Sequence, residues 1–155
     1  MDLVYGDLQL RDVPELKWSG SQSHLDHIIE AIKRVDNDEV EMVYGKLNGA
    51  IIVKGGIDYK KIEGTGFIWM VNVKDEFQSK GIGSQYFTEL ERRIKVRGLN
   101  RVTMAVEESN PRAKALYLRN GYSEKEKIIE RWDEIDSQGN IVKIVAPCDL
   151  LEKEL

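Results

Sequence analysis

Two glycines separated by a single residue stand directly before a long amphipathic stretch of the sequence. Lys80, Gly81 and Gly83 lie in the segment Val71–Ser84, which reads as a strand, a short loop and the start of a helix. Glycine lets the backbone approach a ligand closely, and the first amides of a helix lack an acceptor within the helix. Together with the helix dipole and the Lys80 charge, such amides suit a pyrophosphate. Taken alone, two glycines are more typical of a turn in which glycine only relieves crowding.

A dinucleotide-binding turn is the alternative chemistry for the same two glycines. Gly81 and Gly83 could open such a turn, with Glu107 about 24 residues further on, where a ribose-binding acid belongs. The third small position of that motif falls on Tyr86, which is too bulky for close packing of a helix on a strand. The N-terminal half also lacks the repeated β-α-β pattern. A nicotinamide-dependent enzyme is therefore the weaker interpretation.

Hydrophobic periodicity predicts the elements that position this turn. The expected strands are Leu3–Arg11, Met42–Tyr44, Ala50–Lys54, Phe67–Val73, Arg101–Val106, Ile128–Ile135 and Ile141–Val145, with hairpin turns at Asn48-Gly49 and Ser137–Asn140. The expected helices are Ser23–Val35, opened by a capping box of Ser23 and Asp26, then Ile82–Arg97, and a short helix framed by Asn110, Pro111 and Gly121. This order predicts a mixed α/β fold with hairpins at both ends and β-α-β crossovers between them.

Composition limits the class of protein. A length of 155 residues, with 41% hydrophobic and 32% charged residues, predicts one globular domain over residues 1–155. A net charge of −4 argues against nucleic-acid binding and favours cationic partners such as protonated amines. The sequence shows no signal peptide, and no apolar run approaches the ~20 residues of a membrane helix. The lone Cys148 forms no intrachain disulfide, so a cytoplasmic location is expected.

Metal chemistry is not expected from this sequence. His24 and His27 fall on one predicted helix but have no further ligands nearby in the sequence. Both are therefore interpreted as surface histidines.

Two sequence blocks resemble those of a known enzyme family. The first, Gln78-x-x-Gly81-x-Gly83, follows a predicted strand and resembles the acetyl-CoA signature Q/R-x-x-G-x-G/A of the GCN5-related N-acetyltransferase (GNAT) family. The second, Val106–Tyr122, is similar to the family's strand followed by N-x-x-A-x-x-L-Y-x-x-x-G-F/Y. The blocks stand in the family's order and span Phe67–Tyr122, over a third of the chain.

The resemblance implies a fold, a reaction and a set of site residues. The implied fold is a central mixed β-sheet flanked by helices, with strands that are splayed after Val73. The implied reaction transfers an acetyl group from acetyl-CoA to a primary amine of a small molecule or peptide, by direct attack in a ternary complex and without a metal. The implied catalytic residue is Tyr117, as the acid that protonates the thiolate. The implied cofactor-binding positions are Val71, Val73 and Asn110 for the pantetheine arm, and Gln78, Ser79, Lys80, Gly81, Ile82, Gly83 and Ser84 for the pyrophosphate.

Several assignments stay open at this point. Without the surrounding motif, Tyr117 would be interpreted as a core residue and Asn110 as a plain helix N-cap. Histone-acetylating relatives carry a glutamate base on the strand that matches Phe67–Val73, but this strand has no carboxylate. The remaining candidates for the base are Glu63, Glu107, Glu108 and a water molecule.

The sequence also leaves open which amine accepts the acetyl group. Its binding site is expected to be formed by Trp18–Val35, by the Gly55–Gly66 connection and by the last hairpin. That hairpin is aromatic and acidic, which suits a cation, although an ordinary solvated hairpin has the same composition. The residues in question are Trp132, Asp133, Glu134 and Asp136. A homodimer is compatible with the sequence, and a catalytically weak acyl-CoA-binding regulatory module is the alternative function.

Overall fold

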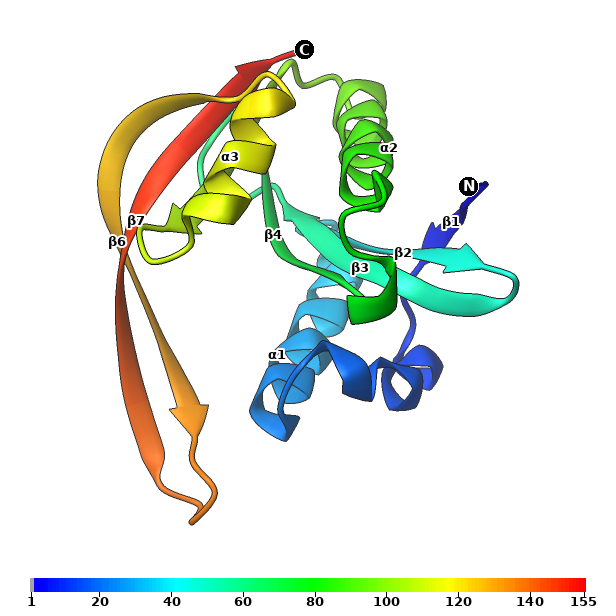
Figure 1. Cartoon of the computed structure of the whole chain (residues 1–155), viewed down its shortest axis with the longest axis vertical. Helices are drawn as coiled ribbons and strands as arrows, with labels where there is room; N and C mark the ends of the chain where they lie inside the picture. The colour runs from blue at the N-terminus through cyan, green and yellow to red at the C-terminus, as the bar shows by residue number, and fades with distance from the viewer. Residues whose placement is uncertain (1) are drawn as a thin grey trace.

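Short apolar and alternating segments build a seven-stranded sheet (Figure 1). In the computed structural model, which describes residues 2–155, the strands are β1 (Val4–Asp7), β2 (Val40–Leu47), β3 (Ala50–Asp58), β4 (Gly66–Val73), β5 (Arg101–Glu107), β6 (Ser123–Ile135) and β7 (Ile141–Glu154). Their order is β1-β2-β3-β4-β5-β7-β6, and among these strands only the β4–β5 pair is parallel. The expected mixed α/β sheet is confirmed.

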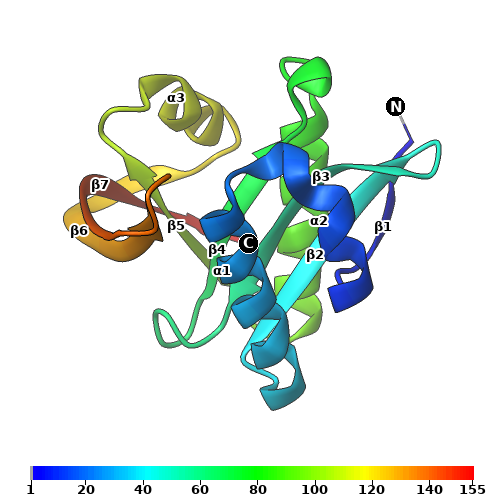
Figure 2. The same cartoon turned by 90° about the horizontal axis from the view of Figure 1, so that it is seen from below.

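Helices cover both faces of this sheet. They are α1 (Gln22–Lys33), α2 (Ile82–Val96) and α3 (Pro111–Arg119). Figure 2 shows α1 and α2 on opposite sides of strands β2 to β4. Leu25 and Ile28 of α1 pack against Val40 and Met42 of β2 in one hydrophobic cluster, whereas the apolar stripe of α2 belongs to the second and larger cluster. No helix within residues 2–155 is both long and apolar enough to cross a membrane.

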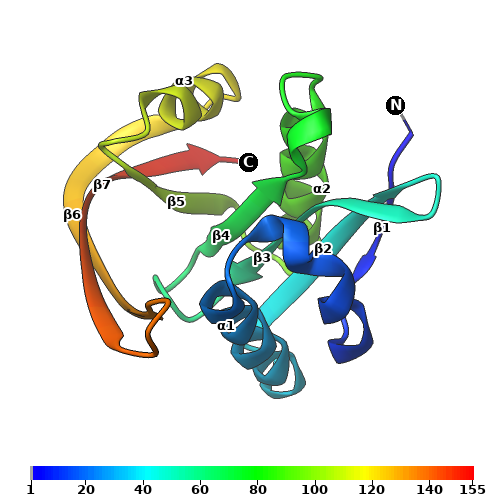
Figure 3. The same cartoon turned by 60° about the horizontal axis from the view of Figure 1, so that its bottom comes forward.

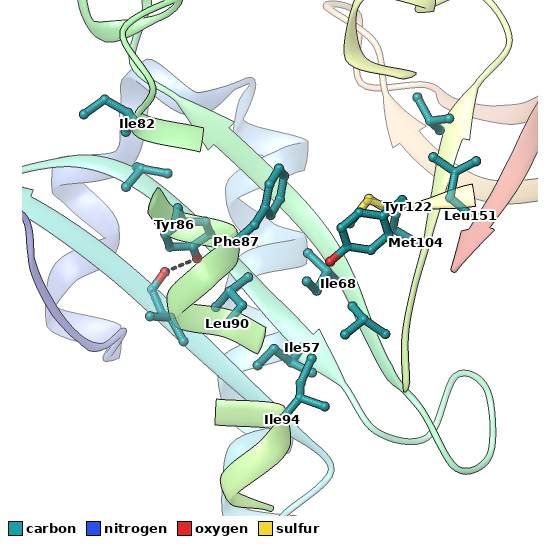
Figure 4. Close-up of a cluster of buried hydrophobic side chains, with 14 of the residues drawn as sticks. Ile57, Ile68, Ile82, Tyr86, Phe87, Leu90, Ile94, Met104, Tyr122 and Leu151 are labelled. Atoms are coloured by element: carbon teal, nitrogen blue, oxygen red, sulfur yellow. Dashed lines mark hydrogen bonds between the residues drawn. The ribbon is translucent and has the colours of Figure 1, made fainter. Parts of the chain in front are cut away.

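The apolar stripe of α2 fixes this helix firmly on the sheet. Figure 4 shows Tyr86, Phe87, Leu90 and Ile94 pointing from α2 into the core, and each of these side chains is at most 2% exposed. The hydroxyl of Tyr86 donates a hydrogen bond of 2.7 Å to the backbone carbonyl of Val43 on β2. The N-terminus of α2 is therefore held in a defined place beside β4.

Strands β4 and β5 diverge soon after they begin to pair. Their ladder contains Gly66 with Val102 and Phe67 with Thr103, and no further pairs within the described residues. Figure 3 shows the two strands running apart toward their C-terminal ends, with α2 and α3 on either side. The expected splay is present, but it starts after Phe67 rather than after Val73. The edge of β4 that faces β5 is consequently free for another hydrogen-bonding partner.

A β-bulge interrupts β4 in the same region. Lys54 pairs with Asn72 and Gly56 with Trp69, so two residues of β4 oppose the single Gly55 of β3. Met70 in this bulge has a φ of +60°, which is unusual for a residue with a side chain. A Cβ on Gly55 would lie 3.1 Å from the Cα of Val71, so glycine leaves the room that the bulge needs.

The N-terminal strand is shorter than predicted. The expected strand Leu3–Arg11 ends at Asp7, and a 3-10 helix follows at Leu10–Ser19. Val13 and Leu16 are buried against α1, with the three-residue spacing that a 3-10 helix places on one side. Pro14 lacks the backbone N–H that a longer strand would use for pairing.

The first α-helix is capped by a different residue from the one predicted. Its N-cap is Ser21, whose hydroxyl accepts a hydrogen bond of 3.2 Å from the amide of His24. The predicted cap Ser23 lies inside the helix, where its hydroxyl accepts from the amide of Ile135 at 3.3 Å. That contact comes from a segment 112 residues away, so local pattern could not reveal it.

The C-terminal hairpin is much longer than predicted. The expected strands Ile128–Ile135 and Ile141–Val145 cover only the distal part of β6 and β7. The first residues of β6 are charged and exposed, which hides a strand from a hydrophobicity pattern. The second half of β7 lies between β5 and β6, so its residues have sheet partners on both sides.

Candidate active site

A cavity of about 710 Å³ lies between the C-terminal part of β4, the N-terminus of α2 and helix α3. Tyr117 and nine of the ten predicted cofactor-binding residues line it: Val71, Val73, Gln78, Ser79, Gly81, Ile82, Gly83, Ser84 and Asn110. The tenth, Lys80, is outside the lining, and its ammonium lies 5.8 Å from the centre of the Phe77 ring. The fold thus brings together two sequence blocks that are about 25 residues apart in the chain.

The turn into α2 exposes backbone amides toward this cavity. Gly81 is the N-cap and has a φ of +79°, a conformation that favours glycine. The helical hydrogen bonds begin with the amide of Gln85, which donates to the Gly81 carbonyl at 3.2 Å. The amides of Ile82, Gly83 and Ser84 precede that bond and can donate to an anion at the positive end of the helix dipole.

Charged side chains make the same cavity suitable for phosphate groups. Arg112 and Arg119 of α3 line it, and its lining contains no carboxylate. Arg112 also donates a hydrogen bond of 2.6 Å to the hydroxyl of Ser79, which ties α3 to the glycine turn. The protein is acidic as a whole, so this arrangement is a local concentration of positive charge.

Two of the predicted cofactor-binding residues make structural hydrogen bonds. The side-chain nitrogen Nε2 of Gln78 donates to the carbonyl of Val73 at 3.0 Å, which closes the loop after β4. Asn110 is the N-cap of α3, and its side chain accepts a hydrogen bond of 3.1 Å from the amide of Ala113. Both residues line the cavity, so a structural role and a ligand contact are compatible for each.

A second cavity, of about 590 Å³, lies on the other side of the splayed strands, between α1, β4 and the hairpin β6–β7. Trp69 and Trp132 contribute aromatic surface to it. Four carboxylates line it: Glu30, Glu107, Glu130 and Glu134. Glu130 is already paired with Lys61 at 3.0 Å, and of the two guanidinium groups Arg34 is already paired with Asp58 at 3.0 Å, which leaves three carboxylates and Arg131. This cavity therefore suits a cation, in contrast to the first.

The two cavities meet at Tyr117. Val71, Asn72 and Tyr117 line both of them. The Tyr117 ring packs edge-on against Phe87, with ring centres 5.3 Å apart. Burial raises the pKa of the Tyr117 hydroxyl above its usual value, so the group stays protonated at neutral pH and can act as a proton donor.

The three carboxylates among the candidates for a base lie in different places. Glu107 ends β5 and lines the second cavity. Glu108 is outside both linings and lies 3.4 Å from the ammonium of Lys127. Glu63 is exposed in the connection between β3 and β4, away from both cavities. Of the three carboxylates, Glu107 alone lines a cavity.

Sequence reasoning missed two polar residues at the centre of the molecule. Lys54 is fully buried on β3, and Asn72 of β4 lines both cavities. The interpretation of both histidines as surface residues was also wrong for His24, which is half-buried and lies 2.9 Å from the Lys54 ammonium. A lone lysine directly after the apolar run Ile51–Val53 was the available signal.

Comparison with known proteins decides the family. The model of the "Acetyltransferase (GNAT) family" matches residues 8–122, which is most of the chain. The chain belongs to the GNAT acetyltransferase family. No curated protein sequence matches it significantly.

Solved structures of GNAT acetyltransferases share its fold. The spermidine N-acetyltransferase from Vibrio cholerae in complex with CoA and spermine is 14% identical, with a TM-score of 0.74 over 98% of this chain and 95% of that one. The ribosomal-protein-alanine N-acetyltransferase from Brucella melitensis is 15% identical, with a TM-score of 0.73 over 99% and 100%. The PaiA N-acetyltransferase from Thermoplasma acidophilum in complex with coenzyme A is 16% identical, with a TM-score of 0.72 over the full length of both chains.

The GNAT fold predicts that nicotinamide dinucleotides do not bind. The position that a dinucleotide turn keeps small is Tyr86, whose ring fills the core under the sheet. We expect no heat of binding for NAD or NADP in titration calorimetry at concentrations where CoA binds. Tight binding of either nucleotide without competition from CoA would contradict this expectation.

Proposed function

We propose that this GNAT protein transfers an acetyl group from acetyl-CoA to a primary amine of a cationic small molecule or peptide, by direct attack in a ternary complex. The observation that carries the proposal is the meeting of two cavities of opposite character at Tyr117. The first has helix N-terminal amides and two arginines for the phosphates. The second has four carboxylates, of which one, Glu130, is already paired with Lys61, and the other three are available to a cation. The solved relatives named for spermidine and for a ribosomal-protein alanine act on amines, which is consistent with this pairing.

The acetyl donor would occupy the first cavity, from its phosphates at the glycine turn to its thioester beside Tyr117. The amides of Ile82, Gly83 and Ser84 would bind the pyrophosphate, with Arg112 and Arg119 adding charge. The pantetheine arm would run along β4, whose edge toward β5 is unpaired beyond Phe67. This route leads the thioester to the point where the two cavities meet.

Positioning and two hydrogen-bond donors assist the attack and the departure of the thiolate. A neutral amine in the second cavity attacks the thioester carbonyl, and holding both reactants in place supplies several kcal/mol of the barrier, roughly as in intramolecular reactions. A backbone amide of β4 near Val73 would stabilise the oxyanion. The C–S bond then breaks, and Tyr117 donates its proton to the departing thiolate.

Turnover against a panel of amines tests this function. We expect the protein to release free CoA thiol from acetyl-CoA with an acceptor that carries more than one positive charge, and to do so without added metal. The panel should contain polyamines, aminoglycosides, amino acids and short peptides, and calorimetry with CoA should be measured on the same protein. Absence of CoA binding at about millimolar concentration would contradict the proposal as a whole. CoA binding without turnover of any acceptor would instead favour the regulatory module.

A further inference from the structure

Lys54 is a buried ammonium group that the reaction described so far does not use. The side chain has 0% exposure, on a central strand. Its Nζ donates a hydrogen bond of 2.6 Å to the carbonyl of Met70 in the β4 bulge and lies 2.9 Å from Nε2 of His24. Neither partner is a carboxylate. Because burial of an unpaired ammonium is costly, the environment favours the neutral amine.

His24 connects this buried group to the acceptor cavity. Its ring lines the second cavity, whereas Lys54 lies behind it and outside the lining. Asn72, which lines both cavities, interacts with the His24 ring, but its buried side-chain oxygen has no hydrogen bond of normal geometry among residues 2–155. A hydrogen-bond acceptor of this kind at the meeting point of the cavities suits the N–H of a substrate amine.

Burial is the main reason why the pair binds an extra proton weakly. Burial lowers the pKa of Lys54 to about 7. Burial, followed by the charges of Lys54 and His27, lowers the pKa of His24 to about 4, against the opposite effects of Glu134 on β6 and Asn72 on β4. Above about pH 7 both groups are neutral, and the pair can accept one proton.

We propose that His24 and Lys54 form a relay that removes the proton from the substrate ammonium before the amine attacks acetyl-CoA. The proposal rests on the proposed N-acetyltransferase function and assigns its base to these two residues rather than to Glu107. His24 would touch the substrate, and Lys54 would act through His24.

The steps of the relay balance. In the tautomer of His24 that carries its proton on Nε2, the lone pair of neutral Lys54 accepts the Nε2–H, and Nδ1 of the ring is the atom that would accept the substrate proton. One N–H bond of the substrate ammonium breaks as an Nδ1–H bond forms, and the Nε2 proton moves to Nζ of Lys54. The neutral amine then forms the C–N bond. The second amine proton leaves the tetrahedral intermediate and replaces the proton that Tyr117 gives to the thiolate, while the relay returns its proton to water.

The relay predicts a pH profile and a dependence on the acceptor. For an alkylamine acceptor, kcat/KM of the wild type should rise with pH through an inflection near 7, because the pair accepts a proton only after losing its own. His24→Gln and Lys54→Met should each lower kcat/KM at pH 7.5 by roughly 100-fold and remove the inflection. With an aromatic amine or hydrazide acceptor, which is already neutral at that pH, kcat/KM of the same variants should fall by less than about 5-fold.

The matched comparison is His27→Gln. His27 lies one turn along α1, lines the same cavity, and its ring contacts the carbonyl of Asp133 at 2.9 Å. This variant should keep the inflection near pH 7, whatever it does to KM. If Lys54→Met lowers kcat/KM equally for alkylamine acceptors and for aromatic amine or hydrazide acceptors, Lys54 only holds the Met70 bulge in place. This result would overturn the relay.

A second measurement does not depend on activity. Lys54 loses its proton at a lower pH in the folded chain than its usual 10.5, so the unfolded chain binds more protons between about pH 7 and 10.5. Lys54 should therefore make the free energy of unfolding rise with pH over this window, and Lys54→Met should remove that rise. If the wild type acetylates amines but neither the inflection nor this rise depends on Lys54, the relay is wrong and the proposed function stands. If CoA does not bind, both the relay and the proposed function are wrong.

Discussion

Replacing Tyr117 by phenylalanine should lower the turnover number by roughly 10- to 1000-fold while CoA affinity changes little, as expected for a group that acts mainly in the transition state. The ring stays in place, because its edge-on packing against Phe87 does not use the hydroxyl. The lost hydroxyl belongs to a residue that lines both cavities. Thiolate leaves fairly easily unaided, so the effect can fall at the low end of this range. Steady-state kinetics with the best acceptor and calorimetry with CoA measure the two quantities.

Tyr122→Phe is the matched control for Tyr117→Phe. The Tyr122 ring also packs near Phe87, but its hydroxyl donates to Glu91 at 2.9 Å and the residue lines neither cavity. This variant should lose some thermal stability, since it removes a buried hydrogen bond to a carboxylate, and should keep its turnover. Wild-type turnover in Tyr117→Phe would reduce Tyr117 to a packing residue and leave bound water as the proton donor.

Gly83→Val should weaken CoA binding by at least about 100-fold, which corresponds to about 2.7 kcal/mol. Gly83 is the second residue of α2 and lines the first cavity. A Cβ there would lie 3.5 Å from the side chain of Leu116, so the chain still folds, but a branched side chain occupies the space through which a pyrophosphate reaches the helix amides. Calorimetry with CoA measures the change.

Gln85→Val controls for the helix itself. Gln85 is exposed on the same turn of α2 and does not line the cavity. Valine is no worse than glycine in a helix, so any loss of binding that is specific to Gly83→Val comes from the cavity. CoA affinity equal to that of the wild type in Gly83→Val would show that the phosphates do not approach this turn.

The sequence alone determined the elements that follow local rules. Asn48-Gly49 closes the β2–β3 hairpin with both residues at positive φ, as a two-residue turn requires. The apolar stripe of α2 and the Asn110-Pro111 start of α3 also appear where spacing and capping place them. The glycine turn and the block around Tyr117 were sufficient to predict the family, because their residue types and spacing follow from binding one kind of ligand.

Tertiary structure decided the features that depend on distant partners. Strand β6 begins among exposed charged residues, and only pairing with β7 makes that segment a strand. Ser23 is no helix cap because Ile135, far along the chain, reaches its hydroxyl. Lys54 is an ordinary lysine in the sequence, and only the packing of α1, β3 and the β4 bulge around it turns it into a buried, neutralised base beside His24. Local pattern records the propensity of a segment, whereas the burial of a charge and the identity of its partner arise only when separate segments meet.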